Sequence, residues 1–235
     1  MDKKPHQVLS QEELKQLHGD EYAARFERTH GRRRLLQLIP QMQLASSQDV
    51  VDFGCGNGLL ATEIHNRVQT YTGVDFSKPF IELAVARTVA LGATNARFVH
   101  SSIEDFCRQN SGRFDVACAF DFSEHVYDEM WLDIARGIRH TLKRGGTLYV
   151  HTPNADFFVE RMKTSRFLLK HSPEHVGVRS MADNTRLLES AGFEIRKRQF
   201  VAHYNILRYL HALTPLPYLG RFLQARLFIT AVRAK

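Results

Sequence analysis

Three glycines and an aspartate lie at spacings that suit the binding of a nucleoside. Gly54, Gly56 and Gly58 follow directly on the apolar segment 50–53, and a helical pattern begins after them. Glycines at a strand-to-helix turn let the backbone approach a ligand and present its amides. Asp75 ends the next apolar segment, close to the spacing at which an acid binds the hydroxyls of a ribose. Because a carboxylate repels a 2′-phosphate, we expect an unphosphorylated adenosine ligand.

The spacing of the glycines distinguishes this loop from the loop that binds NAD. The dinucleotide fingerprint is G-x-G-x-x-G or G-x-G-x-x-A. Here the glycines form G-x-G-x-G, and Leu59 stands where the third small residue belongs. The pattern therefore disfavours NAD as the ligand.

His125 is the side chain best placed for acid–base chemistry. It follows the apolar segment 114–120 in Asp121-Phe122-Ser123-Glu124-His125, at the edge of a parallel sheet where ligands bind. An imidazole there can take the proton of an acceptor hydroxyl. The alternative is that His125 only packs at the start of the next helix. His151 and His175 are weaker candidates, and such histidines are more often structural.

Strand patterns alternate with helical patterns after residue 47, which is typical of βαβ units and a parallel sheet. We predict strands near 49–53, 70–75, 95–99, 114–120, 146–151, 193–201 and 226–233. Helices are expected at 57–68, 78–91, 128–142 and 181–190, with a short turn near 102–107. The predicted fold is α/β: a Rossmann-like, seven-stranded, mostly parallel sheet with helices on both faces and a hairpin-like final pair.

Three segments lie outside this repeating pattern. Residues 1–47 are expected to form a helical cap ending near Pro40, ahead of a cofactor-binding domain over 48–235. Insertions at about 153–179 and 202–222 interrupt that domain, and loops on a rigid scaffold carry specificity. We expect the apolar and basic 202–222 segment to be a lid over the acceptor. A patch that touches a membrane and a plain cover for the sheet edge are the alternatives.

Taken in order, these motifs resemble those of the class I methyltransferases that depend on S-adenosylmethionine (SAM). The resemblance covers about residues 48–201, roughly two-thirds of the chain. It rests on the glycine loop at 51–58, the acid-bearing segment 73–77, the polar segment 100–106, the strand 114–121 and the turn 142–148.

The resemblance implies a SAM site at one edge of the sheet. Gly54 and Gly56 would pass under the methionine part of SAM, and Asp52 would anchor its amino end. Asp75 would hold the ribose. The other implied contacts are Phe76 after that acid, Ser102 and Ile103 beside adenine, Phe120 and Asp121 near the sulfonium, and Tyr22 over the methionine carboxylate. Tyr22 is equally well explained as a core aromatic of its helix.

The ubiquinone-biosynthesis O-methyltransferases are the subgroup that the chain resembles most in its motifs. Their motif is a carboxylate, two residues and then Glu-His, matched here by Asp121, Glu124 and His125. In that subgroup these groups are linked to a divalent metal, and carboxylates and imidazole suit such an ion. The subgroup usually has Glu where Asp121 stands, so the match to its metal-linked motif is incomplete.

Composition narrows the range of partners. The 235 residues carry a formal charge of +7, and residues 157–235 hold 14 Lys and Arg against five Asp and Glu. Such asymmetry suits an anionic partner or a membrane surface, or is a solvated basic face. No segment has the pattern of a membrane span or signal peptide, and three cysteines favour a reducing cytoplasm. No module that reads nucleic-acid sequence is present.

We therefore predict a cytoplasmic methyltransferase that transfers a methyl group from SAM to a small-molecule acceptor. The expected acceptor atom is a hydroxyl of an aromatic or lipophilic metabolite. Two alternatives are methylation of RNA or protein, which only the basic C-terminal third supports, and a SAM-binding module without turnover. The sequence indicates neither the acceptor's identity nor the oligomeric state.

Overall fold

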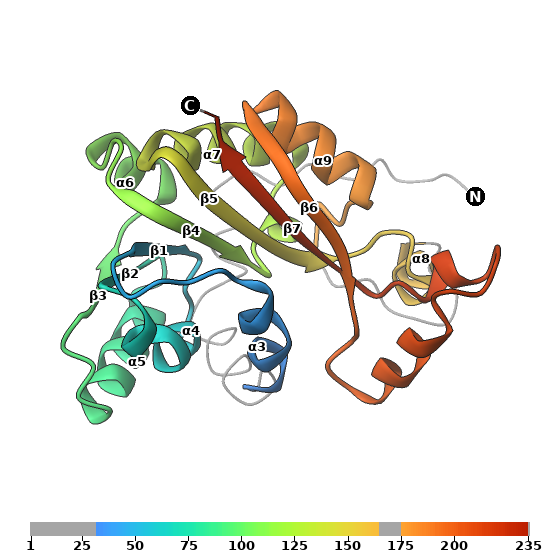
Figure 1. The fold of residues 1–235 in the computed structure, drawn as a ribbon, viewed down its shortest axis with the longest axis horizontal. Coiled ribbons are helices and arrows are strands. Elements are labelled where there is room, and N and C mark those ends of the chain that lie inside the picture. The colour runs from blue at the N-terminus through green and yellow to red at the C-terminus, as the bar shows by residue number, and fades with distance from the viewer. Residues whose placement is uncertain (1–31, 165–174, 235) are drawn as a thin grey trace, which may run out of the picture.

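A computed structural model describes residues 32–164 and 175–234, and these residues form one seven-stranded sheet (Figure 1). The strands are β1 (Asp49–Phe53), β2 (Thr70–Asp75), β3 (Ala96–His100), β4 (Phe114–Phe120), β5 (Leu142–Pro153), β6 (Phe193–Val201) and β7 (Arg226–Arg233). Their order across the sheet is β3-β2-β1-β4-β5-β7-β6. The first five pair in parallel, and β7 runs antiparallel to both β5 and β6. The predicted fold class is confirmed.

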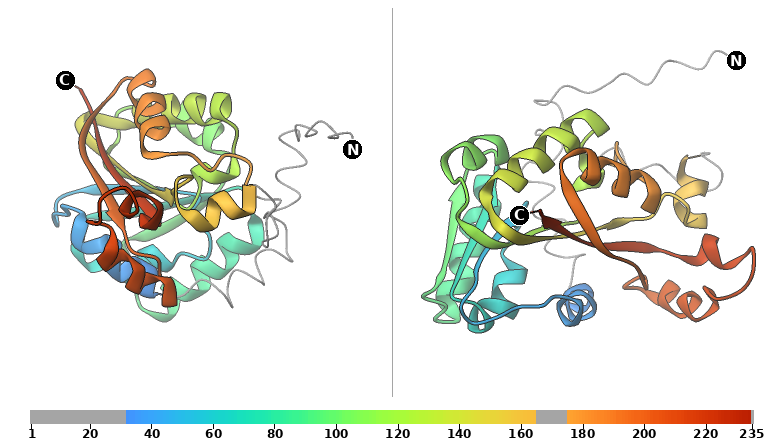
Figure 2. Two further views of the ribbon diagram at one scale, coloured as in Figure 1. Left: turned by 90° about the vertical axis from the view of Figure 1, so that its right-hand side faces the viewer. Right: turned by 45° about the horizontal axis from the view of Figure 1, so that its top comes forward.

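Helices cover both faces of the sheet (Figures 1 and 2). One face carries α3 (Arg33–Leu38), α4 (Leu59–Ile64) and α5 (Lys78–Ala90), and the other carries α6 (Ile103–Gln109), α7 (Asp128–Thr141) and α9 (Met181–Ser190). The shorter elements are η1 (Ile39–Gln41), η2 (His65–Arg67), η3 (Ser123–His125), α8 (Phe158–Thr164), η4 (Ile206–Leu213) and η5 (Gly220–Leu223). In the described ranges no helix combines the length and apolarity needed to cross a bilayer.

Helix α7 illustrates how the sequence builds these layers. Trp131, Ile134, Ala135 and Ile138 are buried at helical spacing and belong to the core cluster on that face. The first turn is acidic and the last turn is basic, which suits the helix dipole. The opposite face has its own core cluster, built from α3, α4 and the strands beneath them.

Most predicted boundaries agree with the structure, and the exceptions have local causes. Strand β5 begins at Leu142, because Leu142 pairs with Phe114 before a shift in register. The predicted helix 57–68 is shorter and divided: Gly58 is left-handed with φ of 72°, so α4 begins only at Leu59 and is followed by η2. The expected turn at 102–107 is a helix, α6, because the hydroxyl of Ser102 caps it by accepting from the amide of Asp105.

The segments outside the repeating pattern gather near one end of the central strands (Figure 2). The 153–179 segment contributes α8, and the 202–222 segment contributes η4 and the start of η5. Of the expected cap over 1–47, residues 1–31 lie outside the described residues. The remainder forms α3 and η1, and η1 includes Pro40.

Candidate active site

The glycine loop leaves β1 in a conformation that only glycine adopts easily. Gly54, Gly56 and Gly58 have φ of 69°, 51° and 72°. A Cβ at Gly54 would lie 3.0 Å from the ring of Phe122. The amides of Gly54 and Cys55 donate to the carbonyl of Val74 at 2.9 and 3.1 Å, which ties the loop to the end of β2. The loop therefore brings bare backbone to the carboxyl edge of the sheet.

Asp75 lies at the end of β2 and holds the same loop through its carboxylate. One oxygen accepts from the amide of Gly56 at 3.0 Å, and the other accepts from the amide of Ser77 at 2.9 Å. Burial raises the pKa of Asp75 to about 6, although these amide bonds oppose the rise. Each carboxylate oxygen keeps a second lone pair. The residues present therefore fit a ligand that offers two neighbouring hydroxyls, as the ribose of SAM does.

Asp52 lies beneath this loop in β1 and is almost completely buried. It accepts a hydrogen bond from the phenol of Tyr71 at 2.6 Å. Burial raises the pKa of Asp52 to about 7, while Tyr71 and the charge of Arg34 lower it. A cationic amino group next to Asp52 would favour the ionised carboxylate.

The residues expected beside adenine lie at the ends of β2 and β3. The amide of Ser101 donates to the carbonyl of Asp75 at 3.0 Å, which joins the two strand ends. The carbonyl of Phe76 lies 2.8 Å from the Nε2 atom of His100. Ile103 packs into the core, and the hydroxyl of Ser102 caps α6. The side-chain polar groups of Ser102 and His100 are thus already engaged within the protein.

Asp121 is the centre of a buried charge cluster just beyond β4. Its backbone is left-handed, with φ of 51°, and its amide donates to the carbonyl of His151 at 2.8 Å. The carboxylate pairs with Arg34 through one oxygen. Its other oxygen accepts from Arg226 at 2.5 Å and lies 3.0 Å from Nδ1 of His151. These neighbours hold the pKa of Asp121 well below its usual range, against the effect of burial.

This cluster tests whether Asp121 could bind the divalent metal that the resemblance to the ubiquinone-biosynthesis subgroup suggests. The Asp121 carboxylate is enclosed by two guanidinium groups and an imidazole, so it does not fit a divalent cation. Sequence reasoning missed Arg34 and Arg226 as partners. No motif marks them, because they lie 87 and 105 residues away from Asp121 along the chain.

A second group of side chains surrounds η3. Glu124, His125 and His175 each offer one ligand atom, and these atoms lie within 4.8 Å of one another. The rings of the two histidines meet edge to face, with centroids 5.1 Å apart. Glu124 accepts from the hydroxyl of Thr152 at 3.0 Å. Burial and the charge of Asp121 raise the pKa of Glu124 to about 8. One carboxyl and two imidazoles suit either proton transfer or a metal ion.

Arg179 fixes the chain that carries His175 against η3. Its side chain is buried, and it donates to the carbonyls of Ser123, Val126 and Gly177 at 2.6–2.8 Å. The amide of Gly177 donates to the carbonyl of Glu124 at 2.9 Å, and a Cβ on Gly177 would lie 2.1 Å from the carbonyl of Val126. Sequence reasoning also missed these two residues. The only sequence signal for them was Gly177 itself, the single glycine of the 153–179 insertion.

Phe120 and Tyr22 are the remaining residues of the expected site. Phe120 is buried at the end of β4, with its ring edge-on to His151 at a centroid distance of 6.3 Å. Burial lowers the pKa of His151, although Asp121 opposes that shift. Tyr22 lies outside the described residues.

Comparison with known proteins places the chain in a family. A family model described as a methyltransferase domain matches residues 25–198. This segment includes β1 to β5 and the glycine loop, so the match covers the fold and the predicted cofactor edge together.

Curated relatives are similar in sequence to part of the chain. A ubiquinone biosynthesis O-methyltransferase of Vibrio parahaemolyticus is 30% identical over 143 residues, which is 60% of this chain and 60% of the relative. A protein of the same name from Serratia proteamaculans is 27% identical over 178 residues, 73% of this chain and 72% of the relative. The chain thus spans about three fifths of the length of the first of these relatives.

Solved structures share the whole architecture at lower identity. The methyltransferase of a Haloferax volcanii complex with the Trm112 methyltransferase activator aligns with a TM-score of 0.71 at 18% identity, covering 97% of this chain and 100% of that one. Geranyl diphosphate C-methyltransferase from Streptomyces coelicolor, solved with Mg²⁺, geranyl diphosphate and S-adenosyl-L-homocysteine, aligns with a TM-score of 0.64 at 16% identity, covering 97% and 85%. At these identities the likeness concerns the fold.

Proposed function

Because this chain belongs to the class I SAM-dependent methyltransferases, we propose that it methylates a hydroxyl of a small aromatic or lipophilic molecule. The observation that carries the acceptor class is a group of aromatic side chains from the two insertions. Phe157 and Phe158 come from the first, and His203 and Tyr204 from the second. Their ring centroids are 4.5–6.2 Å apart along the series.

These aromatic rings adjoin the charge cluster at the end of β4. The guanidinium of Arg226 lies 4.9 Å from the centre of the Tyr204 ring and donates to its hydroxyl at 3.1 Å. The same guanidinium donates to Asp121. An acceptor beside these rings would therefore lie at the carboxyl edge of the sheet, where ligands of open α/β folds bind.

We assign most of the cofactor site to the ends of β1, β2 and β3, and the end of β4 would border it near the sulfur. Asp75 would bind the ribose hydroxyls of SAM, and Asp52 would bind the amino group of its methionine part. Gly54 and Gly56 would lie under that part, Phe76, Ser102 and Ile103 would border adenine, and Phe120 and Asp121 would lie near the sulfur. SAM supplies an electrophilic methyl group on a cationic sulfur. What remains for the protein is mainly to align the acceptor oxygen with that methyl, and such alignment is worth about 7–11 kcal/mol.

His125 would act as the general base for the acceptor hydroxyl. It lies on η3, directly after the strand whose end borders the proposed cofactor site. The ring of His125 contacts that of His175. Burial raises the pKa of the neighbouring Glu124 to about 8, which favours the protonated form of Glu124.

The test of the acceptor class uses matched pairs of compounds. Each pair consists of a phenol with an apolar side chain and the same molecule with that hydroxyl already methylated. We expect S-adenosylhomocysteine to form with the free phenols and not with their methyl ethers. Turnover with RNA or protein substrates and none with any phenol would contradict the proposal.

Chelation distinguishes the base from a metal ligand. If His125 acts as a base, dialysis against EDTA leaves kcat unchanged. Loss of activity that Zn²⁺ or Mg²⁺ restores would instead assign Glu124, His125 and His175 to a metal ion.

A further inference from the structure

A segment between β6 and β7, residues 205–222, exposes apolar side chains in unusual density; we call it the 205–222 hairpin. It projects beyond the end of the sheet (Figure 1). Six large apolar residues are exposed within it: Ile206 (77%), Tyr209 (66%), Leu213 (44%), Leu216 (46%), Tyr218 (91%) and Leu219 (63%). The other exposed large apolar residues of the described chain lie on α3, on α5 and at Leu91 directly after α5. Several large exposed apolar side chains within one short segment indicate an interaction site.

The hairpin holds these side chains outward in a fixed arrangement. The amide of Gly220 donates to the carbonyl of Leu216 at 2.9 Å. A Cβ at Gly220 would lie 2.0 Å from the carbonyl of Thr214, so η5 packs directly against the end of η4. Tyr218 at the tip has φ of 61°, a conformation that side chains rarely adopt. A lid would turn its apolar residues toward an acceptor, whereas these face solvent.

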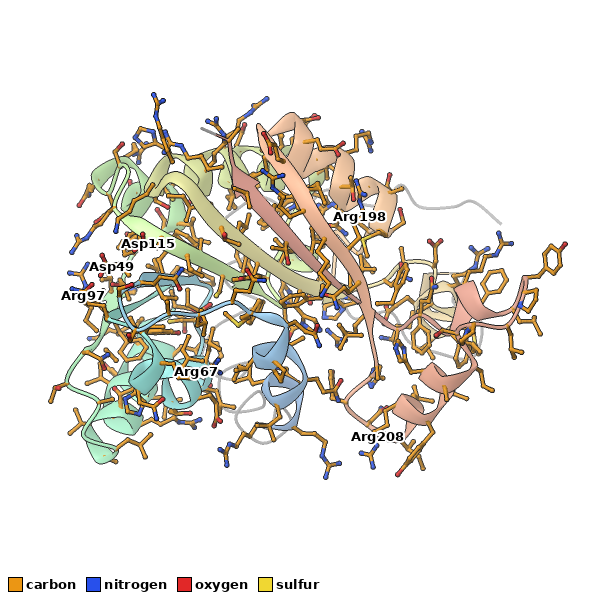
Figure 3. All side chains as sticks on the ribbon, viewed as in Figure 1. Asp49, Arg67, Arg97, Asp115, Arg198 and Arg208 are labelled. Carbon is orange, nitrogen blue, oxygen red and sulfur yellow. The ribbon has the colours of Figure 1, made fainter. Side chains whose placement is uncertain are left out.

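The apolar surface is combined with positive charge and no negative charge. Residues 195–235 contain eight Lys and Arg and no Asp or Glu. The guanidinium of Arg208 lies 4.7 Å from the centre of the Tyr209 ring, and that of Arg221 lies 4.6 Å from the Phe222 ring (Arg208 is labelled in Figure 3). From α8, Arg161 approaches Phe222 at 5.5 Å. The acid of α8, Glu160, is paired with Lys163 at 2.8 Å.

We propose that the 205–222 hairpin docks on the surface of an anionic lipid bilayer. Its exposed aliphatic and aromatic side chains would enter the boundary between headgroups and acyl chains, and Arg208 and Arg221 would contact lipid phosphates. Apolar residues bordered by arginines are the composition that such a surface selects. A nucleic acid would match the charge and leave the six apolar side chains in water. Two copies of an acid-free face would repel each other. The docking does not depend on which hydroxyl the enzyme methylates.

The test is flotation of the full chain with vesicles. Wild type is expected to float with vesicles of equal parts phosphatidylglycerol and phosphatidylcholine, and far less with phosphatidylcholine alone. The triple variant Ile206→Ser, Tyr218→Ser, Leu219→Ser should bind the anionic vesicles at least tenfold more weakly. Replacing Arg208 by Gln should weaken binding about fivefold, since each basic residue near an anionic surface contributes about that factor.

The matched control carries the same kind of change on α5. Val89→Ser with Leu91→Ser removes two apolar side chains that are 73% and 54% exposed, and it should float like wild type. Each variant should keep its thermal shift with SAM, which reports folding at the cofactor edge. If the triple variant does not fold, the single variant Tyr218→Ser serves in its place, with a smaller expected loss.

Three results would overturn the proposal. One is a wild-type chain that stays with neither type of vesicle. Another is a hairpin variant that floats as well as wild type. The third is a wild-type dimer that the triple variant abolishes while no vesicle binding occurs, which would assign the hairpin to a second copy of the chain. None of these results bears on methyl transfer, so the proposed function would stand or fall separately.

Discussion

The two halves of the carboxyl edge of the sheet are built by different means. At the ends of β1 and β2, two buried carboxylates are held by near neighbours: backbone amides bind Asp75, and Tyr71 on the adjacent strand binds Asp52. At the end of β4, Asp121 is held by guanidinium groups from α3 and β7. The first half is local and mostly backbone. The second depends on charges that the fold brings together from distant parts of the chain.

We propose that this difference separates recognition of the cofactor from recognition of the acceptor. A backbone loop with one or two carboxylates suits a ligand that every member of the family shares. An assembled cluster of side chains can change with the acceptor while the sheet stays the same. The two halves should therefore be separable by mutation.

The largest expected effect on cofactor binding is at the ends of β1 and β2, which we call the local half. Asp75→Ala removes the groups that would bind the ribose and the acceptor of the Gly56 amide. SAM at a hundred times its Kd adds about 2.7 kcal/mol to the free energy of unfolding of wild type, and we expect none of this in the variant. Thermal unfolding with and without SAM measures it.

The control for that experiment is Asp133→Ala, which removes an exposed acid on α7 that pairs with Arg136. It should keep the full shift with SAM. An undiminished shift in Asp75→Ala would show that the cofactor binds elsewhere.

At the end of β4, which we call the assembled half, mutation should lower the stability of the fold rather than cofactor binding. Arg226→Leu leaves the buried Asp121 with fewer partners, and breaking a buried charge pair costs about 3–5 kcal/mol. Denaturation with urea should show this loss. Arg196→Leu breaks an exposed pair with Glu194 and should cost about 1 kcal/mol or less.

The same variant also tests whether the two halves are independent. Folded Arg226→Leu protein should keep its thermal shift with SAM. An Arg226→Leu variant as stable as wild type would show that the charge cluster around Asp121 does not stabilise the fold. A variant that folds but no longer responds to SAM would show that this cluster also contributes to cofactor binding.

A smaller effect is expected in the pH dependence of stability. Burial raises the pKa of Glu124 to about 8, of Asp52 to about 7 and of Asp75 to about 6. A carboxyl whose pKa is raised in the folded state stabilises the fold fully below its unfolded pKa and loses that effect as pH rises through the folded value. Without SAM, the melting temperature should therefore fall between pH 5 and pH 8.

Glu124→Gln tests which half sets this slope. Glutamine keeps the shape and the hydrogen bond with Thr152 but does not titrate. The fall in melting temperature above pH 7 should flatten in this variant. A slope equal to that of wild type would mean that Glu124 is ionised in the folded protein throughout this range.

The sequence predicted the local half well because its signals are short-range. Gly54 to Gly58 and Asp75 are readable from spacing alone, and the strands that carry them have strong apolar patterns. The seven strands and their fold class followed from the same patterns. The start of β5 was predicted late, because Leu142 joins the sheet through pairing with Phe114 and not through its own neighbours.

The assembled half was only partly predictable. His125 and Asp121 stood out by their place after β4, but the arginines that enclose Asp121 carry no motif. His175 lies 50 residues past His125, and its segment is anchored beside η3 by Arg179 and by the amide of Gly177. Tertiary packing decides such neighbours, so spacing along the chain does not reveal them.

We propose that one half of the edge binds SAM and that the other carries out transfer, with His125 as the base. The most direct measurement compares SAM affinity and single-turnover transfer in His125→Ala, with the exposed His140→Ala on α7 as control. We predict an unchanged Kd for SAM and a transfer rate at least about a hundredfold lower, with neither altered in the control. Full transfer activity in His125→Ala would contradict the claim.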